Sequence, residues 1–193
     1  TIFTTKYMIE NWHSHFVPEC YFDTVLFKKI LKTNKRLKHR KGCNNVVNSF
    51  RIVKGKKGDL HDTFGVGMVD KDKRELDYLN ECEALIETKN LILWKHKETQ
   101  HFVIQLYPPI EKWIVEILKA DNRGVEDFGY SKDFKKLKHE IKEDIDDEGD
   151  ERLNNLLDAV VLSKNKTITE LKRIMLYLRE KTYAADINEL KNA

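Results

Sequence analysis

Two short apolar runs of the chain each end in acidic residues, in the segments FVPECYFDTVLF and FGVGMVDKDKREL. The first segment contains Glu19 and Asp23, and the second contains Asp70 and Asp72. Short apolar runs of this kind are typical of buried strands, and a helical pattern follows the first one over residues 22–31. Because ligands bind beyond the carboxyl ends of the strands in open α/β sheets, these acids are expected at a ligand-binding edge.

The alternation of strand and helix continues along residues 1–120 and predicts an α/β fold with a mostly parallel sheet flanked by helices. Further strands are expected at 13–18, 64–69, 91–96 and 101–106, and further helices at 46–53, 74–87 and 110–118. Residues 55–58 read as a turn. Beyond Gly124 the pattern is helical and polar, so residues 121–193 are expected to form a C-terminal helical extension packed on the α/β domain.

Positive charge is concentrated in one part of the sequence. The net charge is only +3, yet no Asp or Glu occurs from Thr24 to Gly58, where Lys and Arg are frequent. Clustered cations bind a polyphosphate by releasing counterions, which favours a nucleic acid, DNA or RNA, as the partner; the alternative is a solvated surface. The residues expected to contact nucleic acid are Lys35, Arg36, Lys38, Arg40, Lys41, Lys71 and Lys73.

Several classes of protein are disfavoured. The three cysteines, Cys20, Cys43 and Cys82, are odd in number and far apart, which argues against a disulfide framework and against a structural zinc site. No apolar stretch approaches the length of a membrane span, and the first residues lack the apolar core of a signal peptide. A cytoplasmic location without membrane association is therefore expected.

The acidic pairs are suited to a hard divalent cation. Mg²⁺ and Mn²⁺ prefer oxygen ligands, and Mg²⁺ keeps several waters, so a few carboxylates from different strand ends hold it. Crowded carboxylates also repel one another unless a cation neutralises them. Metal-assisted phosphoryl chemistry is therefore the leading hypothesis, with Mg²⁺ or Mn²⁺ as the cofactor.

These segments resemble the TOPRIM domain shared by topoisomerases, primases and the overcoming-lysogenization-defect nucleases, and the nuclease branch is the most similar. Such domains carry a Glu at the end of the first strand, often an Asp shortly after it, and a DxD motif after a later strand. Glu19 with Asp23 matches the first motif, and Asp70 with Asp72 matches the second. The resemblance spans residues 13–118, and YPPIEKWI places Glu111 where the nuclease branch has a further Glu.

The resemblance implies a metal-dependent nuclease, acting in phage defence or DNA repair. Asp70 and Asp72 would bind one ion, Glu19 would share it or accept a proton, and Glu111 would complete a second metal position. Lys71 and Lys73 are the lysines closest in sequence to these acids. The usual Gly after the first Glu is replaced by Cys20, which is expected to narrow the site or change the turn.

Other interpretations remain open. Asp23 is also suited to the first turn of a helix, Asp72 to a helix N-cap and Glu111 to a helix N-terminus, none of which needs a metal. The same fold could serve as a non-catalytic module that binds nucleic acid or protein. A DxD phosphatase with Asp70 as nucleophile is a weaker alternative. No P-loop is present, so the chain would act alone, as a homodimer or with a separately encoded partner.

Overall fold

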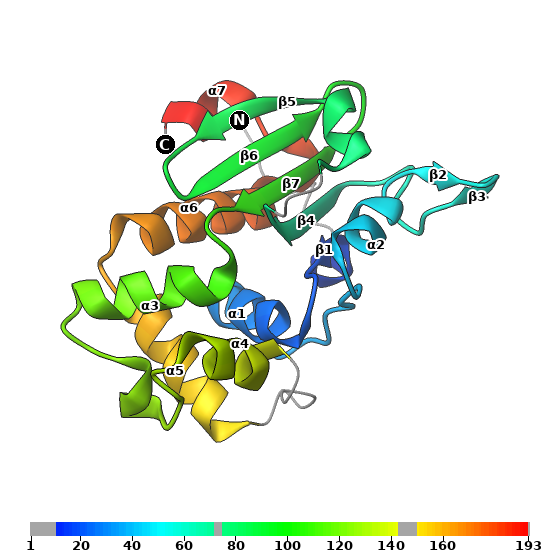
Figure 1. The fold of residues 1–193 in the computed structure, drawn as a ribbon. Helices are drawn as coiled ribbons and strands as arrows, with labels where there is room; N and C mark the ends of the chain where they lie inside the picture. Colours follow the sequence, from blue (N-terminus) through cyan, green and yellow to red (C-terminus); the bar gives the residue numbers. More distant parts are fainter. Residues whose placement is uncertain (1–10, 72–74, 143–149, 193) are drawn as a thin grey trace.

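The structure is a computed structural model of the 193-residue chain and describes residues 11–71, 75–142 and 150–192 (Figure 1). A five-stranded sheet has the order β1 (Phe16–Val17), β4 (Gly65–Asp70), β7 (His101–Leu106), β6 (Leu91–His96) and β5 (Cys82–Glu87). β1, β4 and β7 are parallel, whereas β6 is antiparallel to both β7 and β5. Four of the five strands therefore run in one direction, and the predicted α/β class with a mostly parallel sheet is confirmed; whether the fold is TOPRIM-like stays a prediction.

Helices pack on both faces of the sheet, and their bounds follow the predicted patterns closely in most cases. They are α1 (Tyr21–Leu31), α2 (Cys43–Asn48), α3 (Ile110–Ala120), α4 (Phe134–Lys142), α5 (Glu151–Leu162), α6 (Lys166–Lys181) and α7 (Ile187–Asn192), with 3-10 turns η1 (Trp12–His15), η2 (Asp77–Glu81), η3 (Val125–Phe128) and η4 (Thr182–Ala184). A separate small hairpin consists of β2 (Ile52–Val53) and β3 (Lys56–Lys57) and projects away from the rest of the chain (Figure 1).

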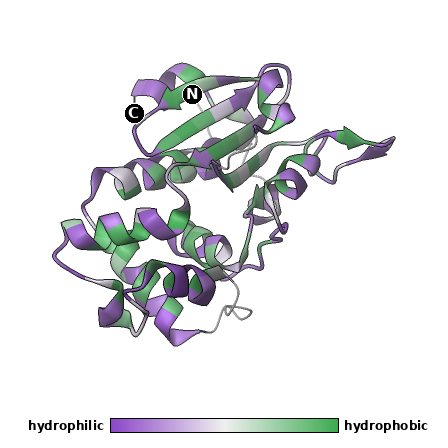
Figure 2. Cartoon of the chain, in the orientation of Figure 1, coloured by the Kyte–Doolittle hydropathy of each residue, from purple (hydrophilic) through white to green (hydrophobic). Residues whose placement is uncertain are grey.

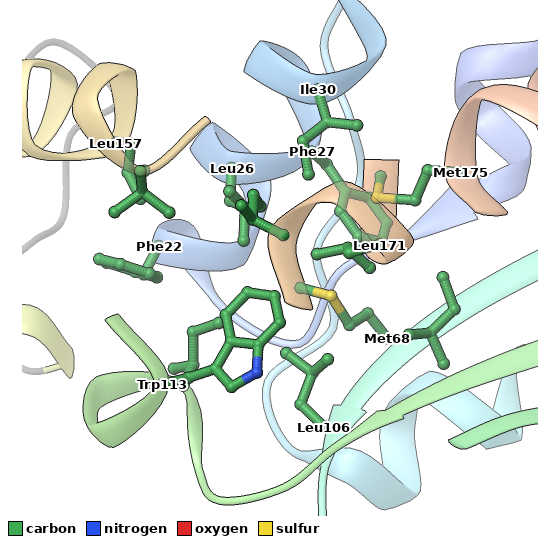
Figure 3. Packing of buried hydrophobic residues seen from close by; sticks show 14 of the residues in the cluster. Phe22, Leu26, Phe27, Ile30, Met68, Leu106, Trp113, Leu157, Leu171 and Met175 are labelled. Carbon is green, nitrogen blue, oxygen red and sulfur yellow. The ribbon is translucent and has the colours of Figure 1, made fainter. Parts of the chain in front are cut away.

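One large apolar cluster joins the sheet to α1 and to the C-terminal helices. Its members include Phe22 and Leu26 of α1, Met68 of β4, Trp113 of α3 and Leu157 of α5, all buried (Figure 3). Hydrophilic and hydrophobic residues alternate along these helices, as the hydropathy colouring shows (Figure 2). Burial of this amphipathic stripe is the main reason why such polar sequences are helical.

The other face of the sheet carries α2, and two glycines allow it to approach closely. A Cβ at Gly65 would lie 2.6 Å from the Phe50 ring, and one at Gly67 would lie 2.7 Å from Cγ1 of Val46. Both contacts are shorter than carbon atoms tolerate, so only glycine fits at these positions. The glycines of β4 thus bring α2, and Cys43 at its first position, against the carboxyl half of β4.

Two predicted helices are wrong. Residues 77–87 form η2 followed by strand β5 instead of a helix, and a register shift between Ala84 and Ile86 marks a β-bulge. The bulge inserts an extra residue, so Cys82 and Leu85 are both buried at a spacing that resembles a helical turn. The predicted helix over 46–53 ends at Asn48, and the chain then forms the β2–β3 hairpin.

That hairpin turns through two residues, Lys54 and Gly55, with φ values of 49° and 77°. Two positive φ values in a two-residue loop are typical of a type I′ turn, whose twist matches the flanking strands. The turn predicted over 55–58 therefore begins one residue earlier, at Lys54.

Candidate functional site

Glu19 follows the carboxyl end of β1 and lies beside the end of β4. Its Oε2 atom accepts a hydrogen bond from the Asp70 amide at 3.3 Å and another from the Cys43 thiol at 3.1 Å. The parallel pairing of β1 with β4 produces this arrangement, because Val17 is in register with Gly67 and both strands end at the same edge. Two acids that are 51 positions apart in sequence are thus neighbours, as their positions after apolar runs predict.

Asp70 is the last residue of β4 and is linked to the start of α3. Its Oδ1 atom accepts a hydrogen bond from the Ile110 amide at 3.0 Å. An acceptor with negative charge at a helix N-terminus satisfies one of the otherwise unbonded amides and interacts favourably with the helix dipole. Asp70 therefore has a structural role at α3 whatever else it binds.

Cys43 is a third member of the site, which sequence reasoning considered only for disulfides and zinc. Burial raises the pKa of the Cys43 thiol strongly, and the carboxylates of Glu19 and Asp70 raise it further. The thiol therefore stays protonated at neutral pH and donates to Glu19. No local pattern marks this residue, because only the packing of α2 on the glycines of β4 brings it to the two acids.

Glu111 and Asp23 occupy the first turns of α3 and α1. Glu111 directly follows Ile110, whose amide binds Asp70, and its side chain is 1% exposed. Asp23 is also buried. The structure thus places Glu111 at the edge where β4 ends, and the helix dipole favours an acid at either position without a metal.

Asp72 and Lys73 lie outside the described residues. Within 11–71, 75–142 and 150–192, no group of three or more His, Cys, Asp or Glu side chains converges as a metal site would require. The donor type of Glu19 and Asp70 fits Mg²⁺ or Mn²⁺, which bind carboxylate oxygens. The described part of the site thus offers a pair of carboxylates at adjacent strand ends.

Cys20, which stands where glycine is usual in the motif that this segment resembles, is the N-cap of α1 with φ −144° and ψ 179°. Any residue adopts this extended backbone, so the position does not require glycine for its conformation. The replacement of glycine therefore does not force a different turn, and its effect is limited to the space that the side chain occupies.

The predicted nucleic-acid contacts lie mainly in the loop between α1 and α2. Lys35, Arg36, Lys38 and Lys41 are exposed, and Arg40 is partly buried. Arg40 forms an ion pair with Asp59, and Lys38 lies 3.4 Å from the same carboxylate. Asp59, which directly follows the segment without acidic residues, thus partly neutralises the charge of the basic loop.

Lys71 lies just beyond Asp70 and extends the sheet by donating its amide to the Leu106 carbonyl at 2.8 Å. Its ammonium group lies 5.6 Å from the centre of the Tyr107 ring, a cation–π distance. Lys71 is exposed, and so is Tyr107, at the edge where β4 and β7 end.

His96 and His101 lie side by side on β6 and β7, with ring centroids 6.0 Å apart. His101 is bonded to the Tyr78 hydroxyl at 2.8 Å and to the Leu60 carbonyl at 2.9 Å. Burial lowers the pKa of His101 to about 4. These contacts define a structural network at the end of β7 opposite the acidic site.

Comparison with protein-family models finds no match to this chain, and comparisons with curated proteins and with solved structures find none either. Within the part of the chain that the structure describes, every helix is too short or too polar to cross a membrane.

Proposed function

We propose that this protein is a metal-dependent nuclease that hydrolyses phosphodiester bonds of DNA or RNA. The observation that carries the proposal is the convergence of Glu19 and Asp70 at the carboxyl ends of adjacent parallel strands, beside a basic loop. The edge beyond parallel strands is where ligands bind in α/β sheets. The proposal retains the TOPRIM-like fold, a role in phage defence or DNA repair and a cytoplasmic location.

Glu19 and Asp70 would hold Mg²⁺ or Mn²⁺, with Asp72 and Glu111 as further candidate ligands. Such an ion lowers the pKa of bound water and neutralises charge on phosphate oxygens. Glu19 would then orient the attacking water or accept its proton, and Cys43 would fix the rotamer of Glu19 through its thiol hydrogen bond. Lys71, exposed next to Asp70, would approach the phosphate.

A second candidate function is a module that binds nucleic acid or protein without cleaving it. It is favoured by the hydrogen bonds that already engage Glu19 and Asp70, since these bonds give both acids a structural role. In that case binding would depend steeply on salt and would be independent of divalent metal. Formation of a homodimer or of a complex with a separate partner stays a prediction under both functions.

Asp70→Asn separates catalysis from structure. The side-chain oxygen of the asparagine still accepts a hydrogen bond from the backbone N–H of Ile110. The substitution is therefore expected to lower the free energy of unfolding by less than about 1 kcal/mol, the value of one charge at a helix N-terminus. Asp70→Ala removes the acceptor as well and is expected to cost about 1–2 kcal/mol. If the carboxylate binds the metal, both variants lose at least about a hundredfold of the Mn²⁺-dependent cleavage rate.

The assay is cleavage of end-labelled single-stranded and duplex DNA and RNA with Mg²⁺, with Mn²⁺ and with a chelator. Glu116→Gln, which changes an exposed carboxylate on α3, is the control and should cleave at the wild-type rate. Cleavage at the wild-type rate by folded Asp70→Asn would refute the role of Asp70 as a metal ligand of the nuclease. Metal-independent binding without any cleavage would support the second function.

A further inference from the structure

A groove runs along the basic loop between α1 and α2. It consists of two adjoining pockets with volumes of about 710 Å³ and 570 Å³. Both pockets are lined by Lys38, His39 and Asp59, so they adjoin one another along this loop. The first pocket extends to Tyr21 and the second to Asn45.

This groove adjoins the acidic site. Tyr21 follows Glu19 by two positions at the start of α1, and Asn45 follows Cys43 by two positions in α2. Between them, the Arg40 amide donates to the Pro18 carbonyl at 2.9 Å and fixes the loop next to Glu19. The loop that lines the groove is therefore tied to the segment that carries Glu19, although neither Glu19 nor Asp70 lines the two pockets.

The charge of the groove is complementary to a phosphate backbone. Its lining includes five cationic side chains, Arg36, Lys38, Arg40, Lys41 and Lys57. The only carboxylate among the residues that line these two pockets is Asp59, which is bonded to Arg40 and lies 3.4 Å from Lys38. The excess of cations favours a polyanion over a neutral or acidic peptide.

An aromatic pair forms one wall. The rings of Tyr21 and His39 have centroids 4.2 Å apart at an interplanar angle of 52°, and both line the larger pocket. Both side chains are only partly buried, so they present surface to the groove. Aromatic side chains beside a basic track are the usual platform on which unpaired bases stack.

We propose that the groove binds single-stranded nucleic acid, with one unpaired base stacked against the Tyr21–His39 pair. The inference rests on the proposed function and names the substrate class of the same site. A base inside a duplex is stacked on its neighbours and reaches a side-chain pocket only after extrusion. The larger pocket has the volume of a small-molecule site, which suits a nucleotide.

The test is equilibrium binding of labelled oligonucleotides of about 12 nucleotides, measured by fluorescence anisotropy in the presence of a chelator. The probes are oligo-dT, oligo-U, a DNA duplex of equal length and an abasic deoxyribose-phosphate strand. Single strands are expected to bind at least about tenfold more tightly than the duplex, and Tyr21→Ala to weaken oligo-dT binding about tenfold. Tyr21→Phe should retain wild-type affinity, because the ring remains.

The abasic strand distinguishes stacking from damage to the fold. If Tyr21 stacks on a base, Tyr21→Ala leaves the affinity for the abasic strand unchanged. His39→Ala provides a second variant outside α1, with the same expected pattern. Equal binding of duplex and single strand, or an equal loss for the oligo-dT and abasic strands in both variants, would overturn the proposal.

Asp59→Asn is expected to raise the affinity for the oligonucleotides, whereas a misfolded variant would bind them less tightly. Loss of this carboxylate releases Arg40 and Lys38 for phosphate contacts, so affinity for both strands should rise several-fold at low salt. An unchanged or lower affinity would contradict the groove as the binding site.

Failure of this inference and failure of the proposed function are distinguishable. Because a chelator is present, binding does not depend on cleavage. Single-strand binding without cleavage by the wild-type protein would support the groove and refute the nuclease. Cleavage at the wild-type rate in both Tyr21→Ala and His39→Ala would support the nuclease function and would refute the groove as the binding site for single strands.

Discussion

Protonation of His101 is expected to destabilise the folded chain at mildly acidic pH. The ring is 1% exposed, stacks on Phe50 with centroids 4.9 Å apart, and has its Nε2 atom 2.9 Å from the Leu60 carbonyl. A carbonyl oxygen only accepts, so Nε2 carries the proton and Nδ1 accepts from one of the two hydroxyls beside it, those of Tyr78 and Thr99, whose oxygens lie 2.8 and 2.7 Å away. A second proton would bind Nδ1, which would then be a donor and would lose the hydrogen bond that it accepts from a hydroxyl.

The magnitude follows from the shift of the pKa. Burial lowers the pKa of His101 from 6.5 to about 4, so between these values the unfolded chain binds one proton more than the folded chain. The stabilisation is therefore fully present above pH 6.5 and is lost as pH falls toward 4. The full shift corresponds to about 3 kcal/mol, of which about 2 kcal/mol should be lost by pH 5.

Urea unfolding of the wild type and of His101→Gln at pH 7.5 and pH 5 measures this effect. The variant is expected to be less stable at pH 7.5 because it loses the ring, but its free energy of unfolding should fall by about 2 kcal/mol less on acidification. Equal losses in both proteins, or an NMR titration of the His101 ring near pH 6.5, would refute the reasoning.

Two further changes test the packing that brings Cys43 to the acids. Gly67→Ala places a Cβ 2.7 Å from Cγ1 of Val46 and should cost about 1–3 kcal/mol in thermal unfolding, partly restored by adding Val46→Ala; a neutral single variant would contradict the contact. Cys43→Ser retains a donor to Glu19, whereas Cys43→Val loses it and should be about 1 kcal/mol less stable than the serine variant in urea unfolding. Equal stability of those two variants would show that the hydrogen bond contributes nothing.

The strand that ends in Asp70 could be predicted because its signal is local, whereas only Phe16–Val17 of the strand expected over 13–18 is extended and Trp12–His15 form a 3-10 turn. Residues 64–69 are apolar throughout and become β4, buried on both faces, and Asp70 ends that strand. A parallel pair places such ends at one edge, so the proximity of Glu19 and Asp70 followed from their positions alone. The helix that begins at Ile110 likewise follows from its apolar spacing after Pro109.

The remaining features depend on contacts between distant segments. The bulge in β5 makes Cys82 and Leu85 look helical, and only pairing with β6 reveals a strand. Cys43 reaches Glu19 because Gly67 admits α2, which no pattern near Cys43 indicates. The Tyr21–His39 wall is formed by a helix start and a loop that local periodicity does not connect.

The central claim is that Glu19 and Asp70 bind a divalent cation. Crystals soaked in Mn²⁺ test it most directly through anomalous scattering. A peak is expected about 2 Å from a carboxylate oxygen of each residue, the coordination distance of a small hard cation. No peak, with Glu19 still bonded to Cys43 and to the Asp70 amide, would contradict it.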